Sequence, residues 1–175
     1  MMARILIGGL LLTALIAGAA MYYLQVFAFF DEVALQEDDL QLTSMFTDAP
    51  EPMIVTNVEA IDGESSPIKF RACFETPMSF GLLTETYEIY ETPEPTIAPP
   101  WFDCFDAEQM GEDLSTGVAL AFMGIENYEY GIDRVVAVYP DGRAFAWHQI
   151  NACGEAAFSR DPVPDDCPPA PERLQ

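Results

Sequence analysis

Basic side chains are scarce in this sequence. Seven lysines and arginines stand against 29 aspartates and glutamates, with a single histidine, and the formal net charge is −22 at pH 7. Every acid follows Phe30, and the 145 residues after it hold six bases against the 29 acids, a net charge of −23. Such a charge repels nucleic acid and anionic lipid. The composition therefore argues against nucleic acid as a partner and permits a basic protein or a cation, although it also serves simple solubility.

Patterns typical of catalytic or metal sites are missing as well. There is no C-x-x-C pair, no glycine-rich phosphate loop outside the apolar N-terminal run, and no calcium loop of alternating aspartates. A Ser-His-Asp arrangement would have to use His148, which lies in an expected strand and is better interpreted as a structural or surface residue. Among 29 acids, close carboxylate pairs arise by accident, so they do not indicate glycosidase chemistry. We expect no enzymatic activity, no cofactor and no metal site.

The N-terminal region, residues 1–30, is predicted to be a transmembrane signal-anchor. No charge occurs from Ile5 to Phe30, and the twenty residues of Ile5–Leu24 suffice as a helix to cross a bilayer. Arg4 precedes the run, which predicts a cytoplasmic N-terminus and an exported domain. A cleaved signal peptide with Ala17-Gly18-Ala19 as its cleavage site is the alternative. The apolar run continues for about ten residues beyond that site, which favours a retained anchor.

Small side chains recur every four residues along this segment, at Gly9, Thr13 and Ala17. They share one helix face, and such a face allows another membrane helix to approach closely. Because glycine and alanine are common in membrane helices generally, the pattern is a candidate packing face and no more.

Four cysteines follow the anchor: Cys73, Cys104, Cys153 and Cys167. An even number without metal-site spacing, in an exported domain, predicts two disulfides, for which three connectivities exist. We favour Cys73–Cys104 and Cys153–Cys167, because the second pair closes a short proline-rich loop. Closing such a loop contributes about 3 kcal/mol.

The remaining chain is predicted to be an α+β domain with a small antiparallel sheet and a few helices, stapled by the disulfides. Residues 31–52 are interpreted as a membrane-proximal acidic helix, with apolar residues at helical spacing up to Thr47, followed by a linker. Residues 53–175 form the domain proper and its proline-rich tail. The expected strands are 53–61, 67–74, 117–125, 134–139 and 143–150, and the expected helices are 79–90 and 103–114. Pro140-Asp141-Gly142 predicts a tight hairpin between the last two strands.

Four bases inside this acidic domain suggest a local role: Lys69, Arg71, Arg134 and Arg143. We interpret Asp133-Arg134 and Asp141-Gly142-Arg143 as ion pairs that brace the hairpin. A pocket for a small anion or carboxylate is the alternative.

The runs SSPIKFRACF, PPWFDCFDAE and EYGIDRVVAVYPDGRAFAWHQINACGE, after an LLTALIAGAAMYYLQVF anchor, resemble a small uncharacterised family of alphaproteobacterial membrane-anchored proteins. Some of these are labelled histidine kinase automatically. The resemblance covers nearly the whole chain and implies a Gram-negative inner membrane with a periplasmic domain. The kinase label conflicts with the absence of a nucleotide-binding domain and of ATP in the periplasm.

These observations favour a non-enzymatic, membrane-tethered periplasmic protein that serves as an accessory or assembly partner of a membrane complex, which it contacts through the N-terminal helix. A first alternative is an acidic docking module for a basic periplasmic protein, such as a c-type cytochrome. A second is a periplasmic hydrolase that uses carboxylates.

Overall fold

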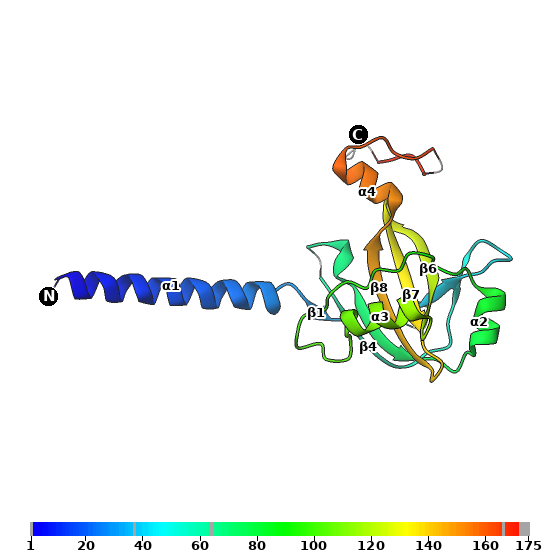
Figure 1. Cartoon of the computed structure of the whole chain (residues 1–175), viewed down its shortest axis with the longest axis horizontal. Helices are drawn as coiled ribbons and strands as arrows, with labels where there is room; N and C mark the ends of the chain where they lie inside the picture. Colours follow the sequence, from blue (N-terminus) through cyan, green and yellow to red (C-terminus); the bar gives the residue numbers. More distant parts are fainter. Residues whose placement is uncertain (1, 37, 64, 166, 172–175) are drawn as a thin grey trace.

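A long N-terminal helix projects from a compact sheet domain (Figure 1). The computed structural model describes residues 2–36, 38–63, 65–165 and 167–171. Helix α1 (Met2–Val26) contains a 24-residue candidate membrane span, Ala3–Val26, in which Arg4 is the one charged residue and whose apolar 18-residue window is not buried by the domain. At 1.5 Å per residue this stretch extends about 36 Å. By length and composition it meets the requirement for a membrane span or a signal sequence, as the uncharged run predicted.

The domain is built on a six-stranded antiparallel sheet in the order β1-β4-β5-β8-β7-β6. Neighbouring strands all pair antiparallel, so the predicted α+β class with an antiparallel sheet is confirmed. The strands are β1 (Asp31–Glu32), β4 (Thr56–Asp62), β5 (Arg71–Glu75), β6 (Leu120–Glu129), β7 (Ile132–Val138) and β8 (Arg143–Ile150). A short 3-10 helix, η1 (Pro67–Lys69), precedes β5.

Both faces of the sheet are covered, which is why every residue of β7 is buried. On one face, Phe70, Phe74 and Phe122 pack with Leu40 and Leu42. On the other face, Trp147, Phe145 and Phe105 form a second apolar cluster under helix α3 (Ala107–Thr116) and the loop before it. Strands with two buried faces have continuous apolar runs in their sequences, and the run VVAV at 135–138 in β7 is of this kind.

The hairpin of β7 and β8 is the most regular local feature. Gly142 has a φ of +91°, and its amide donates to the Tyr139 carbonyl at 3.0 Å. Asp141 accepts a 2.8 Å hydrogen bond from Arg143 Nε, and this pair is the one salt bridge among the described residues. The predicted hairpin and one of its two predicted ion pairs are therefore confirmed.

Side-chain caps start the three short helices of the domain. Ser79 caps α2 (Phe80–Thr86), Asp106 caps α3, and Asn151 caps α4 (Ala152–Ser159), each by accepting from a backbone amide three residues on. Helix α2 ends at Thr86, four residues before the expected end at 90. Helix α3 begins at Ala107, four residues after the expected start at 103. The caps, rather than the apolar spacing alone, locate these ends.

The predicted acidic helix over residues 31–47 is wrong. The described part of residues 31–52 contains strand β1 and a small separate hairpin of β2 (Gln41–Thr43) and β3 (Pro50–Pro52). Leu42 is fully buried in the core, whereas Phe46, counted toward the same helical face, is 78% exposed at the hairpin tip. Tertiary packing of β2 against β6, through Thr43 Oγ1 donating to the Gly124 carbonyl, prevails over the weak helical spacing.

Candidate membrane-proximal site

The end of α1 is held directly by the domain. The indole Nε1 of Trp101 donates to the Val26 carbonyl at 2.7 Å, and its ring stacks on Phe27 with centroids 6.4 Å apart. The last carbonyls of a helix lack partners within the helix, so this bond satisfies one of them. Tryptophan places an apolar ring and one donor together, which suits the boundary between hydrocarbon and water.

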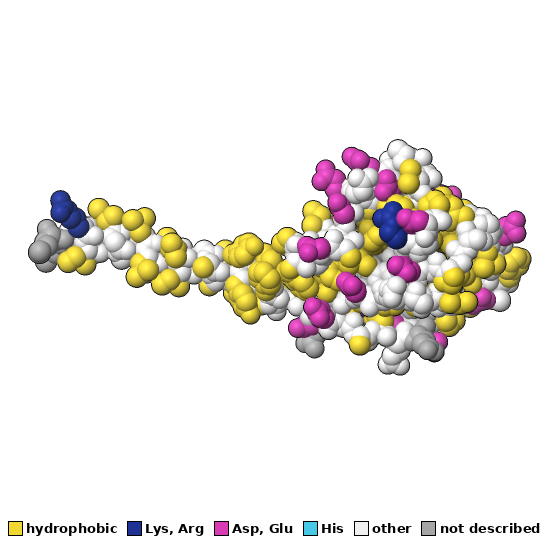
Figure 2. Space-filling view, turned by 90° about the horizontal axis from the view of Figure 1, so that it is seen from below, with side chains coloured by type: hydrophobic (Ala, Val, Ile, Leu, Met, Phe, Trp, Pro, Cys, Tyr) yellow, Lys and Arg dark blue, Asp and Glu magenta, His cyan; other side chains and the backbone are white. Residues whose placement is uncertain are grey.

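Lys69 secures the four residues that connect α1 to the sheet. Its Nζ donates to the Phe29 carbonyl at 3.1 Å and to Ser65 Oγ, and it lies 4.7 Å from the Phe29 ring centroid and 5.2 Å from that of Phe30. Strand β1 then begins at Asp31 and pairs with β4. The junction of residues 26–31 is therefore bound to η1, to β4 and to the loop that carries Trp101. Figure 2 shows a continuous hydrophobic surface from the helix into this part of the domain.

The predicted packing face on α1 is open. Gly9 and Ala17 are exposed, and a Cβ on Gly9 would meet nothing within 4 Å. Thr13 uses its hydroxyl within the helix, donating to the Leu10 carbonyl at 3.0 Å. Whether another helix packs on this face stays a prediction.

Both favoured disulfides are present. Cys73–Cys104 joins the middle of β5 to the loop between Trp101 and α3, with Cα atoms 6.3 Å apart. Cys153–Cys167 ties the proline-rich tail to α4, with Cα atoms 5.7 Å apart. The first bond fixes the loop that holds α1, because Cys104 lies three residues from Trp101. Two disulfides also indicate an oxidising compartment.

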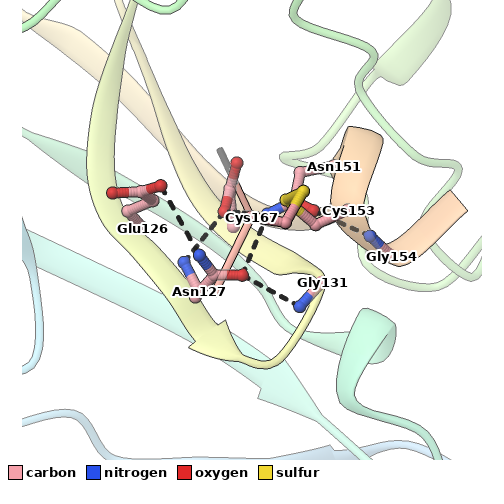
Figure 3. The surroundings of a disulfide bond; sticks show 8 residues. Glu126, Asn127, Gly131, Asn151, Cys153, Gly154 and Cys167 are labelled. Atoms are coloured by element: carbon pink, nitrogen blue, oxygen red, sulfur yellow. Dashed lines mark hydrogen bonds between the residues drawn. A yellow bond between two sulfur atoms is a disulfide. The ribbon is translucent and has the colours of Figure 1, made fainter. Parts of the chain in front are cut away.

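A buried polar network lies beside the second disulfide (Figure 3). Asp133, 3% exposed, accepts from the Asn127 amide at 2.9 Å, from Asn151 Nδ2 at 2.7 Å and from the Tyr90 hydroxyl at 3.1 Å. Burial raises the pKa of Tyr90, which keeps its proton and remains a donor. The predicted Asp133–Arg134 ion pair is wrong, because side chains of consecutive strand residues point to opposite faces.

Arg134 instead pairs with His148. Its Nε donates to His148 Nε2 at 2.9 Å, its Nη1 donates to the Asp39 carbonyl at 2.6 Å, and its guanidinium lies between the rings of Phe70 and Tyr128. His148 Nδ1 lies 2.5 Å from the Pro67 carbonyl, so the neutral ring donates there and accepts from Arg134. Burial, with Arg134 adjacent, lowers the pKa of His148 to about 3. Both ring nitrogens are occupied, and the expectation of a structural histidine fits this arrangement.

Arg71 braces the long loop that follows α2. Its guanidinium donates to the carbonyls of Thr96, Ile68 and Phe70 at 2.6–2.7 Å, and burial lowers its pKa to about 10. These carbonyls occupy the guanidinium, so the anion-pocket interpretation gains no support at Arg71. Within the described ranges, no group of three or more His, Cys, Asp and Glu side chains is placed to hold a metal ion.

A groove of about 640 Å³ adjoins the junction. It runs along residues 58–60 of β4, between residues 32–34 on one side and residues 101–104 on the other. The sequence did not point to this groove or to Trp101, and it singled out Lys69 only as one of four bases in the acidic domain, not as a residue of the junction. The one available signal is the Pro-Pro-Trp sequence at 99–101, since proline and tryptophan often mark a rigid loop at an interface.

Comparison with known proteins gives a family but no activity. Residues 40–168 match the model of a family of unknown function (DUF6446). No curated protein and no solved structure matches the chain at a significant level. The expected resemblance to an uncharacterised family is confirmed at this level, while the source and the membrane anchoring of its members stay predictions.

Proposed function

The chain belongs to this family of unknown function, DUF6446, and from that premise we propose that it is a membrane-tethered, non-enzymatic accessory or assembly partner of a membrane complex. In this proposal α1 stays in the inner membrane with the N-terminus in the cytoplasm. The disulfide-bonded domain lies in the periplasm, at the membrane surface.

The observation that carries the proposal is the junction. A domain that acts at a distance from the membrane needs a flexible linker. Here only residues 27–30 separate α1 from the sheet, and Trp101 and Lys69 bind this segment at Val26 and Phe29. A short, fastened junction restricts the domain to contacts within its own height above the bilayer. Partners that are themselves membrane proteins satisfy that restriction.

The open face of α1 supports contact inside the bilayer. Gly9, Thr13 and Ala17 lie on one side of the helix, whereas Gly18 lies on roughly the opposite side. Replacing a small residue in a helix contact by leucine forces the backbones apart and weakens association. The two sides therefore provide a test and a matched control.

The experiment is co-purification from native membranes in mild detergent after crosslinking, with wild type, Gly9→Leu with Ala17→Leu, and Gly18→Leu. We expect one set of membrane proteins to accompany wild type and Gly18→Leu and to be lost from the double variant. A chain that purifies without membrane proteins after crosslinking contradicts the proposal. Equal recovery with all three variants removes the α1 face as the binding element.

A further inference from the structure

The outer edge of β4 is open next to the junction. Strand β1 pairs with β4 only at Asp62 and Ile61, and the Val33 amide adds one bond to the Ala60 carbonyl. Along residues 56–59 no described strand lies on that side, and all four residues are exposed. An unpaired strand edge presents backbone donors and acceptors to any extended chain.

The groove described above follows this edge. Val33 packs toward the apolar cluster on one face of the sheet, and Phe102 belongs to the cluster on the other face. The two walls thus stand on either side of the edge, and Val58–Ala60 lie between them. The Cys73–Cys104 disulfide ties the second wall to β5. A cavity of about 640 Å³ has room for several residues of an extended peptide.

All charged side chains that line the groove are acidic. Glu32, Glu59 and Asp103 line it with exposed carboxylates, and no base lines it. None of the three takes part in a salt bridge within the described residues. Figure 2 shows acidic side chains on the domain next to the hydrophobic junction. Such a lining favours lysine and arginine in the occupant.

We propose that this groove binds a basic, extended segment of a membrane protein partner, which adds to β4 as a further strand. Val33 already uses the Ala60 carbonyl, so backbone bonds at Val58 and Glu59 provide part of the affinity. Pairing of lysine or arginine with Glu32, Glu59 and Asp103 provides specificity. The inference rests on the proposed function, because the fastened junction places the groove near the membrane surface, where segments that adjoin a partner's own membrane helix lie.

The register irregularity of β4 limits the added pairing. Asn57 has a φ of +52°, and the pairing of β4 with β5 shifts between Thr56 and Glu59. A bulge of this kind interrupts an edge, and Val33 already pairs at Ala60, so only Val58 and Glu59 remain open to an added strand. The carboxylates therefore have to contribute a large share of the binding, which makes charge reversal an informative test.

The test uses the full-length protein in non-ionic detergent and a fluorescein-labelled eight-residue peptide of alternating lysine and valine. A second peptide carries N-methyl groups on alternate residues and cannot donate along one edge, and a third has glutamate in place of lysine. Fluorescence anisotropy at about 0.15 M salt, where the Debye length is about 8 Å, measures contact rather than the distant field. The variants are Glu59→Lys and, as a matched control on the exposed surface of α2, Glu85→Lys.

We expect the lysine peptide to bind, the glutamate peptide not to bind, and N-methylation to weaken binding at least about tenfold. Glu59→Lys should weaken binding on the order of tenfold and Glu85→Lys less than about twofold, since only the first replaces a contact attraction by repulsion. No binding, equal binding of the N-methylated peptide, or equal losses in both variants overturns the proposal. Failure of α1 to retain partners leaves these results unchanged, so the two proposals fail separately.

Discussion

His148 is the residue whose acid–base chemistry the fold changes most. Its pKa falls from an ordinary 6.5 to about 3, because the ring is buried and Arg134 donates to it. Protonation would put a second cation against the guanidinium and remove the acceptor that Arg134 uses. At neutral pH this residue therefore orients Arg134 and does not exchange protons.

This shift predicts a specific pH dependence of stability. Since the native pKa lies below the unfolded value, the contribution is complete above about pH 6.5 and decreases as the pH falls toward 3. Between pH 7 and pH 5 the free energy of unfolding should fall by about 2 kcal/mol more in wild type than in His148→Gln. Urea unfolding followed by tryptophan fluorescence measures the free energy of unfolding of wild type and of His148→Gln at each pH. The carboxylates contribute equally to the two proteins, and parallel pH profiles would show that His148 titrates normally in the native state.

At the scale of elements, α4 lies directly on the β6–β7 turn. The Asn151 side chain caps α4 and also donates to Asn127, and the Asn151 amide donates to the Gly131 carbonyl at 3.0 Å. A Cβ on Gly154 would overlap the Gly131 carbonyl oxygen and lie 2.8 Å from the Gly131 Cα. The two glycines allow the helix and the turn to touch through their backbones.

Substitution of two helical glycines should therefore have opposite effects. Gly154→Ala should lower the free energy of unfolding by about 1–3 kcal/mol, because backbone atoms cannot yield to the methyl group. Gly111→Ala, in α3, meets nothing within 4 Å and should raise it by about 0.5–1 kcal/mol through helix propensity. Thermal unfolding of Gly154→Ala and Gly111→Ala, compared with wild type, measures the two changes in stability. A stabilised Gly154→Ala protein would place α4 away from the turn.

Removal of either disulfide should separate two functions of the cysteines. Both bonds close loops, of 31 and 14 residues, that are worth about 3–4 kcal/mol each by chain entropy. Cys73→Ser with Cys104→Ser should also free the loop of Trp101, whereas Cys153→Ser with Cys167→Ser should free only the tail. Limited proteolysis should then cut near residues 97–104 in the first variant and after Ser159 in the second. Alkylation of unreduced wild type should modify no cysteine.

The sequence predicts the local elements of this fold better than its long-range contacts. The β7–β8 hairpin is readable because Pro140, Asp141 and Gly142 meet the needs of one turn. The disulfides are readable because few pairings are possible. The strands of residues 31–52 could not be predicted, since β2 is stabilised by a hydrogen bond to Gly124, which lies more than 80 residues away in the sequence. The contacts of the junction could not be predicted from the sequence either, because the hydrogen bond from Trp101 to Val26 joins residues that are 75 positions apart.

At the scale of the whole molecule, the two ends of α1 differ in charge. Arg4 lies in the first turn of the helix, and 29 acids follow the helix. Lysine and arginine near a span stay on the cytoplasmic side. In a Gram-negative host, a reporter that is active only in the periplasm should be active at the C-terminus of the chain. Arg4→Glu together with two lysines inserted after Phe30 should reduce that activity. Activity of a cytoplasmic reporter at the wild-type C-terminus would refute the orientation.

The central claim is that α1 remains attached and holds the domain at the membrane surface through Trp101. The most direct measurement is quenching of tryptophan fluorescence by brominated lipids in reconstituted vesicles. Trp147 is fully buried in the sheet domain and should not be quenched, so Trp101 provides the signal. Bromines near the headgroups should quench wild type more strongly than bromines deep in the chains, and Trp101→Phe should abolish this quenching. Wild-type emission that is insensitive to bromines at both depths would contradict the account.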